Sequence, residues 1–542
     1  MAILIETNEY QTPITEELLS QYPEEVVQQF TEIVNIVPFI KNLINPNRPK
    51  IEDLPRDKEG RAIVDITNPP IYKDADYFRQ AALFYLKNDC YTKLRPNSNP
   101  NSEYRKYWRE ELRRCREGLI RQSDGMYVTG FLYWFLNYCP MMVNFYKEGQ
   151  KKAIRKESFG FFFEGIWWRS IYLYNAREQG HHAIELAKRG CAKSYFLATI
   201  MSHNLIVGES EATHKRCITV LTAAQKEYLK DDKDGTLNKF IPELSFVIDN
   251  TPFPNLLLKN SPNEMSWQMG YKKPNGAIGG SMNQVLGVSA KDDSDKLRGK
   301  RGWILYEEMG TFDGLLELYD VTRKSVEDGD YTFACMYLVG TANNKESSFL
   351  SAKKLLYAPN SYNIQSVPNV YDKKGSGKDT FGFFFPAYIN RAGCYNKDGI
   401  SDVIKALLQV LMARYKAKYG ADPTSVLRVI AEDPITPAEA IIKVKDAYFP
   451  VASLQERADT LDKNPSLYDD IYVGELYTTG TGEIEFRPTD DIPIRTYPVD
   501  NDTKGALEIY SMPKKDREGK VFNDRYIIGV DPKSLGLILV IK

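Results

Sequence analysis

The segment 185–195 places a lysine beside a hydroxyl side chain at the expected start of a helix. It reads ELAKRGCAKSY, so Lys193 and Ser194 form the pair. In a loop of the form Gly-x-x-x-x-Gly-Lys-Ser/Thr, backbone N–H groups cradle phosphates, the lysine reaches the β and γ oxygens, and the hydroxyl serves Mg²⁺. Alanine replaces both framework glycines here, at Ala187 and Ala192. By itself the segment is therefore equally typical of a solvated helix N-terminus.

Two adjacent carboxylates follow a short apolar segment further along the chain. Residues 303–306 read WILY and lead directly into Glu307 and Glu308. Open α/β sheets bind ligands at the carboxyl ends of their strands, where this pattern would place both acids. In ATPases of the additional-strand, catalytic-glutamate class, the first acid holds Mg²⁺ and the second polarises the attacking water. Glu307 takes the first role, usually held by aspartate, and Glu308 the second. An acid pair in the first turn of a helix is the alternative.

A third segment, ACMYLVGTAN at 334–343, is an apolar strand that ends at Thr341. In the same class of ATPases a small polar residue at this point senses the γ-phosphate, and Thr341 would couple phosphate loss to movement. Lys193 precedes Glu308 by 115 positions (308 − 193), and Glu308 precedes Thr341 by 33 (341 − 308), which leaves room for intervening elements. The three segments occur in the required order, each at an expected strand end. Together they predict a nucleotide hydrolase.

The elements that must position these residues are the strands of an α/β sheet. From about residue 119, apolar runs of strand length alternate with helical stretches, a pattern typical of a mostly parallel sheet. The expected strands are 182–186, 218–221, 284–288, 303–306 and 334–339. We therefore expect an α/β P-loop ATPase fold with a mostly parallel central sheet of the additional-strand, catalytic-glutamate type.

Changes of texture divide the chain into four expected sections. Residues 1–118 form a mostly helical N-terminal section, and residues 119–447 form the ATPase domain. Short β segments with turns make 448–520 a linker or β-containing subdomain, and 521–542 holds the first strands of a further domain. Within the first section, 103–119 is expected to be a helix rich in Arg and Glu, with a charged face that is solvated or contacts DNA.

The composition excludes several classes of protein. Lys and Arg number 71 and Asp and Glu 72, so the net charge of −1 excludes a uniformly basic nucleic-acid binder but not a local basic track. Seven scattered cysteines without a C-x-x-C motif, and four histidines, argue against a structural zinc site. Mean hydropathy is −0.42 and no uncharged apolar run reaches 18 residues, so no membrane span is expected. The start MAILIETNEYQ lacks the basic region of a secretory signal, which predicts an intracellular protein.

Several segments, in this order, resemble the large terminase subunits that package DNA in tailed bacteriophages. The phosphate loop of that family is often degenerate, with an arginine ahead of the Lys-Ser/Thr pair, and Arg189 stands in that position. The segments are GMYVTG at 125–130, YWFLNYCP at 133–140, AKRGCAKS at 187–194, KLRGKR at 296–301, EDPITPAEA at 432–440 and YIIGVDP at 526–532. The likeness runs from about residue 119 to 542, and residues before 119 match no segment of the family.

The resemblance implies an ATP–Mg²⁺ site. The nucleotide would rest on a loop formed by Ala187, Lys188, Arg189, Gly190, Cys191, Ala192, Lys193 and Ser194. Lys193 would neutralise the β and γ phosphates and act in catalysis with Glu308, which orients water. Ser194 and Glu307 would serve the metal ion.

Three arginines could add positive charge at the γ-phosphate. Arg189 is expected to do so from within its own loop. Arg298 and Arg301 are candidates for an arginine finger supplied to a neighbouring subunit, with surface ion pairs as the alternative. The resemblance further implies a homo-oligomeric ring that moves double-stranded viral DNA through the portal into an empty capsid. It also implies a portal protein and a small terminase subunit as partners, no membrane, and a location in the bacterial host cytoplasm, transiently at the portal vertex.

The same resemblance places the first metal-binding acid of an RNase H-like nuclease domain at Asp531. That nuclease needs several acids on separate strands to hold two divalent ions, Mg²⁺ or Mn²⁺. After Asp531 only 11 residues remain (542 − 531), and none is acidic. We therefore expect an incomplete nuclease site and no endonuclease activity from this chain alone.

Two other interpretations stay open. One is a helicase-like or chromatin-type DNA translocase, which should show further helicase motifs after residue 341, and segment 428–440 does not resemble them. The other is an assembly scaffold that kept the ATPase fold and does not hydrolyse ATP, which the two alanines at Ala187 and Ala192 favour.

Overall fold

The computed structural model describes residues 6–145, 152–208, 216–230, 235–290, 294–341, 346–372, 379–420, 425–441, 472–482, 484–491, 506–509, 527–530 and 538–541. The chain forms two compact units, Met1–Asp446 and Ala447–Lys542. The sections expected on either side of residue 118 therefore lie within one unit. No described helix is both long and apolar enough to cross a membrane.

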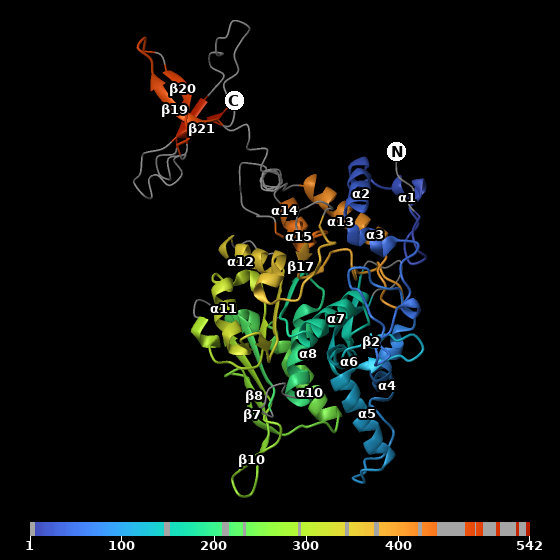
Figure 1. Cartoon of the computed structure of the whole chain (residues 1–542). Helices are drawn as coiled ribbons and strands as arrows, with labels where there is room; N and C mark the ends of the chain where they lie inside the picture. The colour runs from blue at the N-terminus through green and yellow to red at the C-terminus, as the bar shows by residue number, and fades with distance from the viewer. Residues whose placement is uncertain are drawn as a thin grey trace. The chain divides into compact units, whose positions relative to one another are not determined.

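An eight-stranded sheet is the centre of the first unit (Figure 1). Its strands, in spatial order, are β18 (Phe383–Phe385), β5 (Ala183–Ala187), β15 (Met336–Gly340), β12 (Trp303–Tyr306), β6 (Ile218–Ala223), β11 (Gln284–Ser289), β8 (Ser266–Met269) and β7 (Leu257–Ser261). The first six run parallel, and β8 and β7 add antiparallel pairs at one edge. The expectation of an α/β fold with a large, mostly parallel sheet is confirmed.

The inner strands are apolar on both faces because helices cover both faces. β12 and β15 are buried along their whole length, as is β5. Figure 1 shows α11 (Leu315–Val326) and α12 (Glu346–Tyr357) on one side of the sheet. On the other side lie α6 (Gly130–Tyr138), α7 (Glu164–Glu178), α8 (Lys193–Ile206) and α10 (Leu237–Asn250).

Strand β15 lies between β5 and β12, although it comes after both in the sequence. The carboxyl ends of three neighbouring parallel strands therefore meet at one edge. Ala187 ends β5, Tyr306 ends β12 and Gly340 ends β15. This topology brings the three segments singled out in the sequence to the same place.

Short helices precede the sheet along the chain. They are α1 (Glu16–Leu19), α2 (Glu24–Ile36), α3 (Pro38–Ile44), α4 (Gln80–Asn88) and α5 (Glu103–Glu117). Pro23 stands just before α2 and Pro38 begins α3, as expected from the missing proline N–H. Ser102 caps α5 by accepting a hydrogen bond from the N–H of Arg105.

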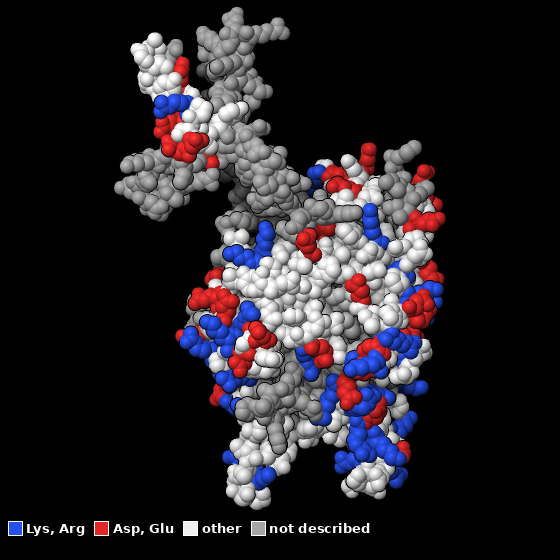
Figure 2. Space-filling view, viewed as in Figure 1, with Lys and Arg blue, Asp and Glu red and all other residues white. Residues whose placement is uncertain are grey.

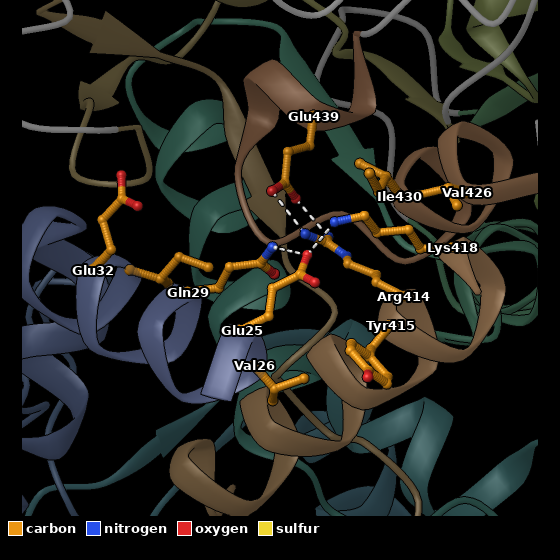
Figure 3. A pocket seen from close by; sticks show the side chains of 11 residues that line it. Glu25, Val26, Gln29, Glu32, Arg414, Tyr415, Lys418, Val426, Ile430 and Glu439 are labelled. Atoms are coloured by element: carbon orange, nitrogen blue, oxygen red, sulfur yellow. Dashed lines mark hydrogen bonds and ion pairs between the residues drawn. The ribbon is translucent and has the colours of Figure 1, made fainter. Parts of the chain in front are cut away.

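Helix α2 packs against α13 (Val403–Lys418) from the far end of the same unit, and α13 contacts α14 (Ser425–Glu432), which in turn contacts α15 (Pro437–Ala440). Glu25 accepts a hydrogen bond from the Tyr419 hydroxyl at 2.7 Å and pairs with Lys418. Arg414 forms a forked pair with Glu439, at 2.9 and 2.7 Å. A cavity of about 260 Å³ lies between these elements, and its lining side chains include both pairs (Figure 3).

The remaining elements are small. The first unit contains the two-stranded sheets β1 (Leu119–Ile120) with β2 (Tyr127–Val128), β3 (Pro140–Phe145) with β4 (Ile154–Phe159), β9 (Tyr271–Lys272) with β10 (Ile278–Gly279), β13 (Glu327–Asp328) with β14 (Tyr331–Thr332), and β16 (Val367–Pro368) with β17 (Thr380–Phe381), and the helix α9 (Lys226–Leu229). In the second unit, β19 (Tyr472–Thr478) pairs with β20 (Ile484–Pro488) and β21 (Leu507–Ile509), and β22 (Ile527–Val530) pairs antiparallel with β23 (Ile538–Ile541).

Candidate functional site

The loop between β5 and α8 turns sharply at two residues with positive φ. Gly190 has φ +73°, and a Cβ there would meet open space. Ala192, directly before α8, has φ +58° in the left-handed region. That conformation costs an L-residue about 1–2 kcal/mol relative to the right-handed one. The phosphate-loop motif places glycine at this position, so the alanine adopts the backbone of a glycine at some energetic cost.

The first residues of α8 contact the two acids that follow β12. Lys193 Nζ lies 2.6 Å from Glu308 Oε1, and the Ser194 hydroxyl donates to Glu307 Oε1 at 2.7 Å. Thr341 donates to Glu308 Oε2 through its hydroxyl at 3.0 Å and through its N–H at 3.2 Å. The structure thus brings together all five residues for which the sequence predicted chemistry at the strand ends.

The backbone after β12 directs both carboxylates toward the loop. The N–H of Glu307 donates to the carbonyl of Thr222 at 2.8 Å, which extends the pairing of β12 with β6. Glu308 then takes φ +51°, a left-handed turn that ends the strand. Thr311 fixes that turn, because its hydroxyl donates to the Glu308 carbonyl at 2.7 Å. The acids therefore follow a strand, and Glu308 directly precedes a single 3-10 turn, Met309–Thr311.

The charges at this site differ between the two acids. Burial opposes the charged form of Lys193, but the carboxylates of Glu308 and Glu307 outweigh it and raise the pKa of Lys193 above its ordinary value. Burial raises the pKa of Glu307, and the charge of Lys193 only partly offsets this. Burial also acts to raise the pKa of Glu308, yet the charge and hydrogen bond of Lys193 and the bonds from Thr341 lower it overall. Glu308 is therefore the more acidic member of the pair.

A cavity of about 280 Å³ opens directly over these contacts. It is lined by Arg189, Gly190, Lys193, Tyr228, Glu308, Thr311 and Thr341. Its walls are mostly polar, and the loop, the second acid and the strand end after β15 all contribute. A group of phosphate size and charge could reach Lys193 and the loop backbone from this side.

The residues present fit a Mg²⁺ ion held jointly with phosphate oxygens. Glu307 is 3% exposed, and its Oε2 has no hydrogen-bond partner within the described part of the chain. Mg²⁺ takes one or two carboxylate or hydroxyl oxygens together with water and substrate phosphates. Ser194 and Glu307 offer that set. No group of three or more His, Cys, Asp or Glu that could hold a metal by itself occurs among the described residues.

The predicted arginines lie in two different places. Arg189 is at the cavity, with a 65% exposed side chain 3.6 Å from Glu432. Arg298 and Arg301 precede β12 and so lie near the amino ends of the strands, away from Lys193 of the same chain. Arg298 pairs there with Asp295 at 2.9 Å. Any role as a finger would have to be played on another subunit. Asp531 lies outside the described residues.

Sequence reasoning missed residues that lie beneath the loop. Arg169 of α7 contacts both Glu185 of β5 and Cys191 of the loop. Lys188, by contrast, was predicted as part of the loop; it is 6% exposed, and burial lowers its pKa to about 8. Tyr228 of α9 also lines the cavity. No local motif marks these side chains, because their positions depend on pairings between distant strands and helices.

Comparisons with known proteins give limited likeness. No protein-family description matches the chain, and no curated protein sequence does. Among solved structures, the large terminase ATPase domain of Thermus phage P74-26 matches 49% of this chain and 92% of its own, with a TM-score of 0.33 and 11% sequence identity. A single-residue mutant of the same domain matches with the same coverage and TM-score, at 10% identity.

Proposed function

We propose that this chain is an ATPase of the additional-strand, catalytic-glutamate class. One observation carries the proposal: Lys193, Ser194, Glu307, Glu308 and Thr341 converge at the carboxyl ends of three adjacent parallel strands. The strand ending at Thr341 lies between the phosphate-loop strand and the acidic strand, which is the order this class requires.

Each residue of the site would have a separate role in ATP binding or hydrolysis, set by its charge and its position. The loop 187–194 would hold the phosphates through its N–H groups, and Lys193 would neutralise the β and γ oxygens. Ser194 and Glu307 would hold Mg²⁺, which neutralises the charge that develops on the phosphoryl oxygens. Glu308, kept ionised by Lys193 and Thr341, would orient water and take its proton. Arg189 would leave its contact with Glu432 and contact the γ-phosphate instead.

We further propose that the ATPase is a DNA-packaging motor of the large terminase kind. The order of the matched segments from 125–130 to 432–440 supports this, and it makes double-stranded DNA, a portal protein and a small terminase subunit the expected partners of a ring in the host cytoplasm. A nuclease role for Asp531 stays a prediction of the same resemblance.

A basic surface on α5 is our candidate for the DNA contact. Figure 2 shows Lys and Arg gathered where α5 lies in Figure 1. Exposed Arg105 and Arg109 donate to the backbone carbonyls of Asn97 and Pro100, contacts that leave their charges unneutralised. Arg113, on the same helix, instead pairs with Glu110 and Glu117. Contacts of this kind to phosphates are sequence-independent and salt-sensitive.

ATP hydrolysis by the purified protein, with and without double-stranded DNA, tests the proposal. We expect Mg²⁺-dependent turnover that DNA stimulates, and Lys193→Ala should abolish it. Replacing Arg105 and Arg109 by Gln should lower DNA affinity and reduce the salt slope by about 2, whereas the matched control Arg113→Gln should change the slope by less than about 1. Nucleotide binding without hydrolysis would favour the scaffold instead. Strand separation driven by ATP would favour a helicase-like translocase.

A further inference from the structure

A fully buried ionic cluster lies directly beneath the phosphate loop. Arg169 pairs with Glu185 through three contacts: Nε to Oε1 at 3.1 Å, Nε to Oε2 at 2.8 Å, and a terminal nitrogen to Oε1 at 2.6 Å. Both side chains are 0% exposed. The Tyr337 hydroxyl of β15 also donates to Glu185. The cluster thus ties together α7, β5 and β15.

The same guanidinium reaches upward into the loop. One terminal nitrogen of Arg169 donates to the Cys191 carbonyl at 2.9 Å, and the other lies 3.2 Å from Cys191 Sγ. The rings of Phe385 and Phe196 pack against the guanidinium, with centroids 5.0 and 5.6 Å away. Arg169 has no freedom to swing aside, and its position fixes that of the Cys191 carbonyl.

The carbonyl of Cys191 and the N–H of Ala192 belong to one planar, trans peptide and point in opposite directions. Because Arg169 holds the carbonyl from below, the N–H of Ala192 is directed away from Arg169, as a phosphate donor must be. The peptide immediately precedes the left-handed turn at Ala192, where φ is +58°. Glycine adopts this conformation freely, whereas alanine needs support from its surroundings.

We propose that Arg169, held by Glu185 and Tyr337, is a positioning residue that keeps the alanine-containing phosphate loop in its nucleotide-binding conformation. The inference rests on the proposed function. It explains how a loop with alanine at Ala192 can still present its N–H groups to phosphate. Glycine at this position would make the loop less dependent on Arg169.

A double-mutant cycle tests this coupling. The variants are Arg169→Lys, which keeps the charge but loses the fork, Ala192→Gly, and the double substitution. The control is Arg48→Lys, because Arg48 pairs with Glu164 at 2.9 Å with both side chains 0% exposed, and its Nε donates to the Pro69 carbonyl at 2.8 Å. For each folded variant, the MgATP dissociation constant, kcat, KM and the thermal midpoint are measured.

We expect Arg169→Lys to raise the MgATP dissociation constant and KM about tenfold, with a smaller change in kcat, a typical coupling for residues in contact. Ala192→Gly should recover most of that loss in the double variant. Arg48→Lys should lower the thermal midpoint without changing affinity. Equal losses from Arg169→Lys with and without Ala192→Gly, or unchanged affinity, would overturn the inference. Failure of the unsubstituted protein to bind MgATP, or binding that survives Lys193→Ala, would instead refute the proposed function.

Discussion

Helix α8 is flanked by two wholly buried glutamates that are accommodated in opposite ways. Glu185, beneath the start of the helix, is matched by Arg169 and by the hydroxyl of Tyr337. Glu243 of α10, against the middle of the helix, accepts a hydrogen bond from the Ser202 hydroxyl at 3.2 Å, and its Oε1 has no partner within the described residues. Both side chains are 0% exposed.

The two sites show how a buried glutamate is stabilised with a neighbouring cation and without one. Burial raises the pKa of Glu243 well above its ordinary value, and the bonds from Cys139 and Ser202 only partly oppose this, so burial favours the protonated carboxyl. Glu185 is instead paired with the guanidinium of Arg169, which also donates to the Cys191 carbonyl of the phosphate loop. The start of α8 contributes Lys193 and Ser194 to the site, whereas its middle packs against Glu243.

The sharpest test of this contrast is the loss of the charge at the start of α8. Lys193→Ala should reduce kcat/KM for ATP about 10⁴-fold, because a cation on the transferred phosphoryl group is worth about 10³–10⁵ in rate. Steady-state hydrolysis with Mg²⁺ is the measurement. Glu243→Gln is the matched control, since it replaces a buried carboxyl that lies beside the same helix but outside the site, and it should leave turnover unaltered. If Lys193→Ala hydrolysed ATP at the rate of the unsubstituted protein, the assignment of the ATP site to the start of α8 would be wrong.

The two acids facing that lysine should separate by role. Glu308→Gln should bind MgATP and lose about 10³-fold in kcat, as expected for a general base. Glu307→Gln should instead shift the Mg²⁺ concentration needed for half-maximal turnover upward. Nucleotide-binding titrations and Mg²⁺ titrations measure the two effects. If Glu307→Gln lost turnover at saturating Mg²⁺ while Glu308→Gln retained it, the two roles would be reversed.

Removing Arg169 should leave Glu185, like Glu243, buried without a cation, and should lower the stability of the folded protein. Arg169→Met leaves Glu185 buried without its cation, which should cost about 3–5 kcal/mol of unfolding free energy. Urea unfolding at neutral pH measures the loss. Adding Glu185→Gln should recover part of it, because the uncompensated charge is then gone. A loss below 1 kcal/mol would show that the pair carries little net energy.

The smallest effect concerns Glu243 and has a defined pH dependence. The pKa of Glu243 is raised in the folded state, so the folded protein holds a proton that the unfolded chain releases above the ordinary value of 4.5. The stability contribution of this group is therefore complete below that value and is lost as pH rises. Glu243→Gln should therefore stabilise the protein more at pH 8 than at pH 4.5. Unfolding at both pH values is the measurement, and equal effects at both would contradict a buried neutral carboxyl.

The main fold and the candidate site were predictable because their signals are local. Each apolar run marks one strand, and Lys193, Glu308 and Thr341 each follow such a run closely. β12 has the bounds that were expected, Trp303–Tyr306, because its four apolar residues are followed directly by the two acids Glu307 and Glu308.

Other features depend on contacts between distant parts of the chain. In the sequence Arg169 looks like any other helical arginine until β5 and β15 are placed beside α7. The left-handed turn at Ala192 could not be predicted, because the residue in this conformation is not a glycine. The antiparallel strands β7 and β8, at the edge of the sheet, also gave no alternating pattern strong enough to be expected.

The position of β15 has a consequence for how the protein reaches its native state. The contact between Lys193 and Glu308 spans 115 positions, and that between Tyr337 and Glu185 spans 152. Closing such long loops is slow, and contacts of high sequence separation form late in folding. β15 must insert between two strands that precede it in the chain before either contact can exist. We therefore expect the site to be among the last parts to form, and the binding of a nucleotide analogue during refolding would report the final step of sheet assembly.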